Sequence, residues 1–370
     1  MLRIHMLHAD HGDCLWVEYG EADASPPKRI LVDCGTERTY REHLKAKIAQ
    51  TVAEEGSVRF ELFVVTHVDA DHIGGALRFL DDAAAPDSGI DIGEVWFNGY
   101  AHLDNQSPYV LGGAQGELLG ELLLRGDWNW NSHFDTRAVM VPDAGDLPQV
   151  DFAGLQLTLL SPDLDRLQKL KPEWEENARK NGLVPGGRLP ENEAVLDDGW
   201  LGEDQTGDVE TLAASAFSQD GAKANGSSIA FLAEYDGVRV LFGADAHPSM
   251  LIASANREPL ADLDTIALDA FKLPHHGSRK NTSVEMLERF PAAHYLVSTT
   301  GQQFKHPDAP AIARVLHAAN GRGACLHFNC RSDYNQRWDD IGEKAEYGYS
   351  TVYGEDGTGL VVELATDGDR

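Results

Sequence analysis

The most concentrated group of chemically active side chains is His67-Val-Asp69-Ala-Asp71-His72. It follows the apolar run of residues 61–66, whose length and composition predict a strand covered on both faces. Alternate side chains of an extended segment point the same way, so we expect His67, Asp69 and Asp71 to converge, with His72 at the start of a helix. Imidazoles and carboxylates at this density predict a metal site, although a polar loop around a buried histidine has the same composition.

Two further polar groups follow apolar runs in the second half of the chain. His275 and His276 come directly after the predicted strand 270–273, and Asp245 follows Leu241-Phe-Gly-Ala. Adjacent histidines at a strand end favour a site more than a histidine pair on an exposed helix does. Asp245 alone could instead be the N-cap of a helix over 247–256. Together with the first cluster, these strand ends supply three carboxylates and four imidazoles.

The elements that must position these side chains alternate between strand and helix on either side of residues 163–223. In the first half, strands are predicted at 2–7, 15–19, 29–33, 61–66, 94–98, 138–141 and 155–161, and helices at 40–54 and 73–84. In the second half, strands are predicted at 227–235, 238–242, 270–273, 295–298, 324–328 and 359–364, and helices at 247–256, 283–289 and 309–319. Asp236-Gly237 is a typical hairpin turn. This pattern favours two mixed halves packed into one four-layer domain over residues 1–370.

Composition and charge exclude several classes of protein. Of 370 residues, 42% are apolar and 25% charged, which is typical of a folded chain. The 60 acidic and 31 basic residues give a net charge of −29, which argues against a surface that binds nucleic acid by counterion release. A nucleic-acid substrate held by metal ions at one site stays open. The four cysteines are scattered as reduced thiols would be, and no apolar run reaches membrane-spanning length, so we expect a cytoplasmic protein.

The ordered motifs resemble those of the metallo-β-lactamase-fold hydrolases. The family signature His-x-His-x-Asp-His reads here as His67-Val-Asp69-Ala-Asp71-His72, with an aspartate at the second histidine position. This form is similar to the branch that contains the hydrolase domain of ComEC-type competence proteins and the phosphorylcholine esterases. The other matches, in family order, are Gly12-Asp13, residues 31–35, residues 225–228, residues 242–245, residues 272–278 and His306-Pro307. The resemblance covers residues 4 to 310 apart from the insertion.

The resemblance implies an α/β fold, a four-layer αββα sandwich with the site along one edge between its sheets. The implied ligands of two divalent metals are His67 and Asp69 on one, Asp71, His72 and His276 on the other, and Asp245 between them. Catalytic roles are implied for Asp71, for His275, which would face the substrate, and for His306. The last would contact substrate or protonate a leaving group, or else only cap the helix over 309–319. Ser161-Pro162 stands where the family has a further histidine, so one metal would be open to substrate or water.

The charges of the implied ligands indicate the chemistry. Asp69, Asp71 and Asp245 contribute −3 against +4 for two divalent cations. A bridging hydroxide would bring the centre near neutrality, and it is the expected nucleophile at neutral pH. Replacing an imidazole by a carboxylate hardens one site, so Mn²⁺ and Mg²⁺ are as plausible there as Zn²⁺.

The leading hypothesis is a dinuclear phosphodiesterase or nuclease, since the Asp69 variant and His275-His276-Gly-Ser favour phosphate esters. The charge of −29 favours a small, short or single-stranded substrate over long duplex DNA. A first alternative is a carbonyl-ester hydrolase such as a lactonase, thioesterase or β-lactamase. A second is a metal-binding subunit of a larger assembly.

Other polar residues have two interpretations each. His8, Asp10 and His11 imitate a ligand motif in the first hairpin turn, where metal binding is not expected. The basic residues Lys272, Arg279 and Lys280 could orient a phosphate or be solvated.

Residues 163–223 form an expected insertion whose stretch 191–210 has eight acidic residues and no Lys or Arg. A solvated segment that leaves and returns at the active edge could be a lid, a partner surface or an inert loop.

Overall fold

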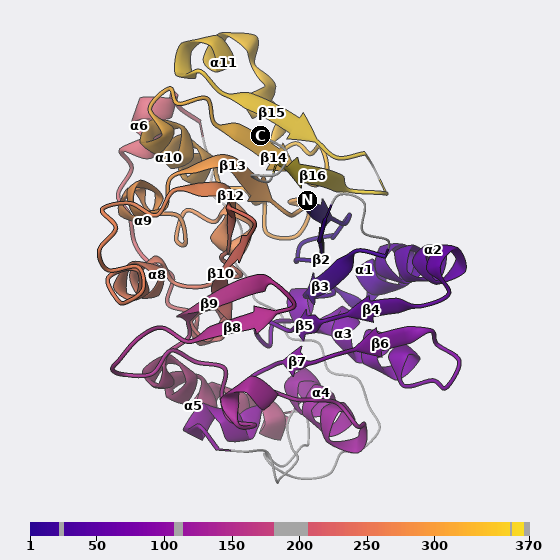
Figure 1. The fold of residues 1–370 in the computed structure, drawn as a ribbon. Coiled ribbons are helices and arrows are strands. Elements are labelled where there is room, and N and C mark those ends of the chain that lie inside the picture. The colour runs from indigo at the N-terminus through magenta and orange to yellow at the C-terminus, as the bar shows by residue number, and fades with distance from the viewer. Residues whose placement is uncertain (22–25, 107–113, 181–205, 356, 366–370) are drawn as a thin grey trace.

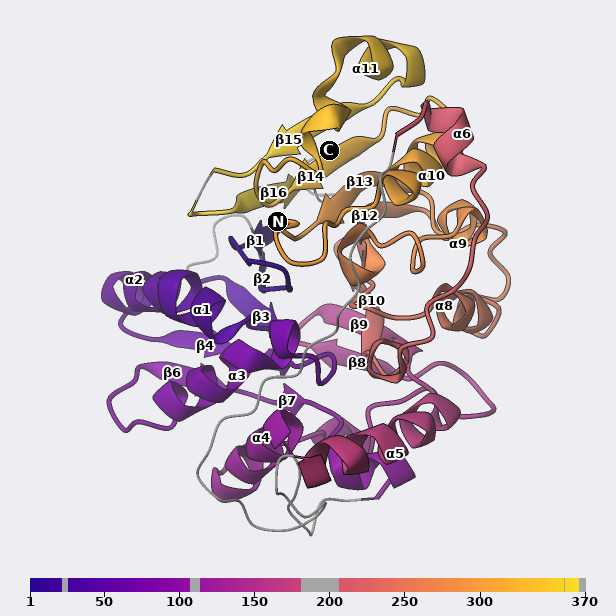
Figure 2. The same ribbon diagram turned by 180° about the vertical axis from the view of Figure 1, so that it is seen from behind.

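Two β-sheets lie face to face at the centre of the molecule, with helices on their outer sides (Figures 1 and 2). The computed structural model describes residues 1–21, 26–106, 114–180, 206–355 and 357–365. The six-stranded sheet, in the order β16-β1-β2-β3-β5-β7, consists of β1 (Leu2–Met6), β2 (Leu15–Tyr19), β3 (Lys28–Val32), β5 (Leu62–Val64), β7 (Val95–Trp96) and β16 (Leu360–Leu364). The eight-stranded sheet, in the order β15-β14-β13-β12-β11-β10-β9-β8, consists of β8 (Gln149–Phe152), β9 (Leu155–Ser161), β10 (Ala230–Tyr235), β11 (Val238–Phe242), β12 (Leu268–Lys272), β13 (Ala292–Val297), β14 (Cys325–Phe328) and β15 (Ser350–Tyr353). The short strands β4 (Val58–Phe60) and β6 (Ile90–Ile92) pair with each other.

The helices complete an αββα sandwich of mixed α/β class, so the expected fold is confirmed. On the side of the six-stranded sheet are α1 (Glu37–Thr39), a π-helical turn (Tyr40–Leu44), α2 (Lys45–Glu55) and α3 (Ala70–Ala83). On the side of the eight-stranded sheet are α6 (Val209–Ala213), α8 (Pro248–Ala255), α9 (Val284–Arg289) and α10 (Ala309–Ala319). The remaining helices of the described chain are α4 (Ala114–Arg125), α5 (Leu164–Lys180), α7 (Lys223–Gly226) and α11 (Ile341–Tyr347). None of the helices within the described ranges is long and apolar enough to cross a bilayer.

Aromatic side chains join the two sheets. Trp96 of the six-stranded sheet has its ring centroid 5.5 Å from that of Phe152 and 6.3 Å from that of Phe231, both in the other sheet. Phe231 also contacts Phe242 on the adjacent strand, at 5.2 Å between centroids. All four rings are nearly or fully buried, so removal of any one would leave a cavity in the inter-sheet core.

Some elements differ from the sequence expectation for identifiable reasons. Residues 138–141, predicted as a strand, form only an isolated bridge from Val141 to Asp163 in the described chain. The side-chain amide of Asn98 pairs with both the N–H and the C=O of Val139, at 2.9 Å each, and so takes the place of a neighbouring strand. The N-cap of α8 is His247, so the capping alternative for Asp245 is wrong.

The ends of the predicted insertion pack against the domain. On α5, Leu167, Leu170 and Trp174 are buried, and on α6 so is Val209. The described parts of the segment 163–223 therefore include buried side chains as well as exposed ones. The acidic residues between 191 and 204 lie outside the described residues.

Phe231→Ala should lower the free energy of unfolding by about 3–5 kcal/mol, because the truncation leaves a cavity between the sheets. The matched control is Phe217→Ala, at a phenylalanine that is 41% exposed, where we expect a loss of about 1 kcal/mol or less. Urea unfolding followed by circular dichroism measures both. Equal losses in the two variants would contradict this account of the core.

Candidate metal centre

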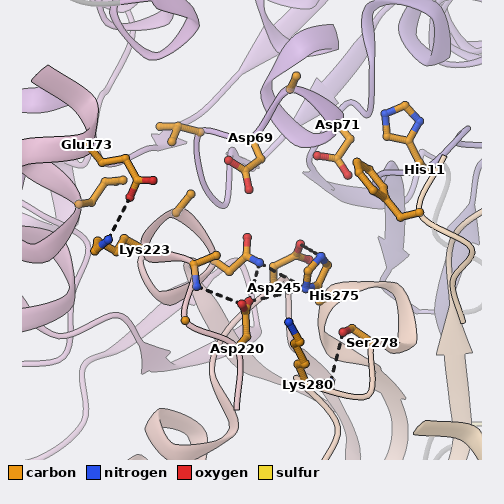
Figure 3. Close-up of a pocket in the computed structure, with 18 of the residues that line it drawn as sticks. His11, Asp69, Asp71, Glu173, Asp220, Lys223, Asp245, His275, Ser278 and Lys280 are labelled. Carbon is orange, nitrogen blue, oxygen red and sulfur yellow. Dashed lines mark hydrogen bonds and ion pairs between the residues drawn. The ribbon is translucent and has the colours of Figure 1, made fainter. Parts of the chain in front are cut away.

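The clustered side chains lie where strand ends of both sheets meet. His67 follows β5, Asp245 follows β11, and His275 and His276 follow β12. The turn between β1 and β2 adds Asp13. Figure 3 shows Asp69, Asp71, Asp245 and His275 at this edge. Residues more than two hundred positions apart, such as His72 and His276, are thus brought together at this edge.

The segment after β5 turns into a helix earlier than expected. Asp69 has extended φ/ψ of −71° and 142° and is the N-cap residue, so Ala70 begins α3. The alternation argument therefore holds through Asp69 but is wrong for Asp71, which lies in the first helical turn. Asp71 Oδ2 nevertheless lies 3.4 Å from His276 Nε2 and 3.8 Å from His72 Nε2. A carboxylate in this turn is also favoured by the helix dipole.

The Asp245 carboxylate lies at the middle of the cluster. Its Oδ1 is 3.5 Å from His72 Nε2. Its Oδ2 is 3.8 Å from the Nε2 atoms of His67, His275 and His276. Asp245 is only 2% exposed, so these imidazoles replace water as its surroundings.

The donor atoms form two overlapping ligand sets. One set is His67, His72 and Asp245, and the other is Asp71, His72 and His276, with the atoms of each set within 4.8 Å of one another. Asp69 Oδ2 lies 3.4 Å from His67 Nε2 and adds a carboxylate to the first set. All six residues expected as ligands therefore lie in one cluster.

Two buried atoms indicate that the cluster fits cations. His67 Nε2 and Asp245 Oδ1 are buried and have no hydrogen-bond partner among the described residues. Buried polar atoms in proteins normally have a partner, so these two are suited to bind an ion. Imidazole nitrogen and carboxylate oxygen are ligands for Zn²⁺ and Mn²⁺.

An outer layer of hydrogen bonds orients the imidazoles. Asp33 accepts hydrogen bonds from the backbone N–H and the hydroxyl of Thr66, at 2.8 and 2.7 Å, and its Oδ2 is 2.7 Å from His72 Nδ1. His276 Nδ1 donates to the carbonyl oxygen of Ser298 at 2.9 Å. Both Nε2 atoms are thereby directed towards the centre, as in known metal sites.

Sequence reasoning gave no role to several of these supporting residues. Asp33 and Asp13 were noted only as parts of matched motifs. Asn281, whose Oδ1 is 3.0 Å from His275 Nδ1, carried no signal because it lies in a loop without a recognisable pattern. Lys272 is neither solvated nor oriented to a phosphate: it is fully buried, with its Nζ 2.7 Å from Asp13 Oδ2.

An unusual backbone conformation presents two consecutive imidazoles to one carboxylate. His275 and His276 have left-handed φ values of 49° and 54° in a 3₁₀ turn. Non-glycine residues rarely adopt this conformation, and such exceptions occur preferentially at functional sites.

The carboxylates give the centre an excess of negative charge that burial does not cancel. Burial alone would lower the pKa of His276, but Asp245 and Asp13 raise it to about 9. Burial would also lower the pKa of His72, yet Asp245 and Asp71 raise it well above its ordinary value. Burial would raise the pKa of the Asp245 carboxyl, and the neighbouring histidines hold it well below its usual range. Positive charge is stabilised here, so cation binding would displace protons.

A cavity of about 590 Å³ opens onto the centre. Part of its wall comes from the predicted insertion, through Trp174 and Glu173 of α5 and Lys223 of α7, and Figure 3 shows Glu173 and Lys223 facing each other. His306 also lines the cavity and is 5% exposed. Its ring centroid is 5.2 Å from that of His275.

The three polar residues of the first hairpin turn lie in two different environments. His11 lines the cavity, with its ring centroid 5.5 Å from that of Phe304. His8 instead contacts the ring of His43, and Asp10 lies 3.8 Å from an Arg38 nitrogen. The three residues therefore do not act as one ligand motif.

Comparison with known proteins gives only distant likenesses. No protein-family model matches the sequence, and no curated protein matches it. The chain is similar in structure to a protein from Parabacteroides distasonis assigned as a metal-dependent hydrolase (10% identity, 88% of this chain and 92% of that one, TM-score 0.37). It is also similar to a diphosphatase of the PhnP family (12% identity, 96% of this chain and 85% of that one, TM-score 0.34). A third similar structure is Zn²⁺-bound PqqB from Methylobacterium extorquens (12% identity, 98% of this chain and 100% of that one, TM-score 0.38). Because all three TM-scores are below 0.4, these likenesses carry no argument about chemistry, which follows only from the residues of this chain.

Asp245→Asn should reduce the metal content of the reconstituted protein by about two ions per chain, because its carboxylate belongs to the first ligand set and its Oδ2 also lies 3.8 Å from His276 Nε2 of the second. His67→Ala should remove about one, because His67 belongs to a single set. The control is His317→Ala, at an exposed histidine of α10, which should leave the content unchanged. Elemental analysis of the dialysed proteins measures this. An undiminished metal content in Asp245→Asn would refute the assignment.

Proposed function

We propose that this protein is a metal-dependent hydrolase of phosphate diesters. The observation that carries the proposal is the buried Asp245 carboxylate, which belongs to one ligand set and lies 3.8 Å from His276 Nε2 of the other, beside a cavity of about 590 Å³. Two divalent cations held by these sets would withdraw charge from a phosphoryl group and lower the pKa of a bound water. The identities of the ions, Zn²⁺, Mn²⁺ or Mg²⁺, belong to the same proposal.

Within this proposal, the chain's own residues position the reacting groups. His275 donates its Nδ1–H to Asn281, which leaves Nε2 as an acceptor on the side of Asp245. Burial lowers the pKa of His306, and Asp308 opposes this only in part. A neutral His306 can donate one N–H to an oxygen of the substrate. His306 is therefore assigned to the leaving group.

Substrate size and charge favour a small diester over a long nucleic acid. The cavity volume is in the range of small-molecule sites. Its lining includes the carboxylates Glu173 and Asp220, which would repel the neighbouring phosphates of a polyanion. Lys280 lines the same cavity and supplies a positive charge for a single phosphate.

The main alternative, a carbonyl-ester hydrolase, can be distinguished from a phosphodiesterase by the substrates that the protein turns over. The test compares turnover of bis-p-nitrophenyl phosphate, a labelled oligonucleotide, a lactone and a thioester, each with Mn²⁺, Mg²⁺ and Zn²⁺. Faster turnover of the lactone or thioester would replace the proposal by this alternative. Bound metal without turnover of any substrate would favour the metal-binding subunit.

Asp71→Ala should lower kcat for the phosphodiester by at least about 100-fold. Replacing a residue that only hydrogen-bonds a metal ligand already lowers activity by up to about 100-fold, and Asp71 is itself a proposed ligand. Asp165→Ala is the matched control, at an exposed aspartate in the first turn of α5, and should keep full activity. Circular dichroism checks that both variants are folded. Unchanged turnover in folded Asp71→Ala would show that the ligand assignment is wrong.

Lys280→Met should raise KM for the phosphodiester about tenfold with a smaller change in kcat, because a charge that binds ground state and transition state alike acts mainly on KM. Lys169→Met, at an exposed lysine of α5, should change neither constant. Steady-state kinetics at two salt concentrations measures both. A pure kcat effect would place Lys280 in the chemical step instead.

A further inference from the structure

A second group of potential ligands lies on the eight-stranded sheet, away from the candidate centre. It consists of His294 on β13 and of Cys325 and His327 on β14. One ligand atom from each of the three residues lies within 4.8 Å of the other two. The carbonyl oxygen that binds His276 belongs to Ser298, four residues after His294, so the two sites are separated by about 13 Å along the strand.

The strand register places all three side chains on one face of the sheet. His294 is paired with Cys325, and Leu296 with His327, so His294, Cys325 and His327 point the same way. Register also aligns Leu296 with Lys272 and Lys272 with Phe242, which belongs to the inter-sheet core. Two imidazoles and a thiol therefore share a face with Leu296, Phe242 and the buried Lys272.

The hydrogen bonding of this trio is incomplete. His294 Nδ1 and His327 Nε2 are 2.9 Å apart and share one hydrogen bond. His327 is 7% exposed, and its Nδ1 is buried with no hydrogen-bond partner among the described residues. A buried nitrogen without a partner is unfavourable, so a packing role alone does not account for the trio.

We propose that His294, Cys325 and His327 bind one thiophilic transition-metal ion, such as Zn²⁺, independently of the candidate hydrolytic centre. Two imidazoles and a thiolate are a ligand set that Zn²⁺ uses, with a fourth position open to water. Nitrogen ligands in tetrahedral geometry are about 3.3 Å apart, and one donor atom of each of the three residues already lies within 4.8 Å of the others. An ion bound by His327 Nδ1 would supply the partner that this buried nitrogen lacks among the described residues. His294 and Cys325 are partly exposed, which gives an ion access.

The protonation states are compatible with this site. Burial, together with the neighbouring His294, lowers the pKa of His327 to about 4. Burial also lowers the pKa of His294. Both imidazoles are therefore neutral at pH 7, which is the form that binds metals.

The test uses the full-length protein titrated anaerobically with Co²⁺ as the probe. A thiolate ligand gives a cobalt charge-transfer band in the ultraviolet, which imidazole and carboxylate ligands do not give. We expect one equivalent of Co²⁺ to produce this band and Zn²⁺ to abolish it by displacement. Cys325→Ser should lose the band while hydrolysis of the phosphodiester and the ions of the hydrolytic centre are retained.

The controls separate this site from other cysteines and from misfolding. Cys330→Ser, at a buried cysteine just after β14, should keep the band. His294→Ala changes a partly exposed side chain and should weaken Co²⁺ binding at this site at least about tenfold even if Cys325→Ser does not fold. Absence of the band at saturating Co²⁺, its persistence in Cys325→Ser, or unchanged binding in His294→Ala would each overturn the proposal and leave a hydrogen-bonded histidine pair.

Discussion

The Asp245 carboxylate, buried among four imidazoles, is the constraint on which the arrangement of the centre depends. An isolated carboxylate would be strongly destabilising at 2% exposure, so its surroundings must supply positive charge. The imidazoles come from the segment after β5, which includes the first turn of α3, and from the turn after β12, and β5 and β12 belong to different sheets. The relative position of the two sheets is therefore fixed at this edge by electrostatics as well as by the apolar core.

The contacts behind the imidazoles join the same two sheets a second time. Asp33, after β3, orients His72, while Asp13, in the first turn, lies 3.4 Å from His276 Nδ1 across the sheet boundary. The hydroxyl of Ser298 donates to the carbonyl oxygen of Gly12 at 3.0 Å. A Cβ at Gly12 would collide with the carbonyl oxygen of Asp71, so only glycine allows the turn to approach α3 this closely. The imidazoles are thus held in place by contacts to the loops of both sheets.

The convergence of the polar clusters could be predicted from the sequence, because each cluster comes after a buried apolar strand and such strands end at a common edge. His67 and Asp245 are examples, and their convergence needed no knowledge of exact strand bounds. The assignment of individual ligands was implied by the family resemblance. Contacts between unrelated loops could not be predicted in this way. The Asn98 amide replaces a strand partner for Val139 across 41 residues, a contact with no local pattern. The helical start at Ala70 was missed because the polar residues of its first turn look like a loop.

Part of the cavity wall comes from helices that carry none of the candidate ligands, and in the proposed hydrolase this would separate substrate choice from chemistry. Trp174 Nε1 donates to Glu117 Oε1 at 2.6 Å and holds α5 against α4. Lys223 Nζ lies 3.6 Å from Glu173 Oε2 and links α7 to α5. This part of the wall is therefore fixed by contacts between helices, while most of the donor atoms lie at strand ends. Under the proposed function, changes on α5 or α7 would reshape the space offered to a substrate without moving a candidate ligand, so the substrate could change while the centre is kept.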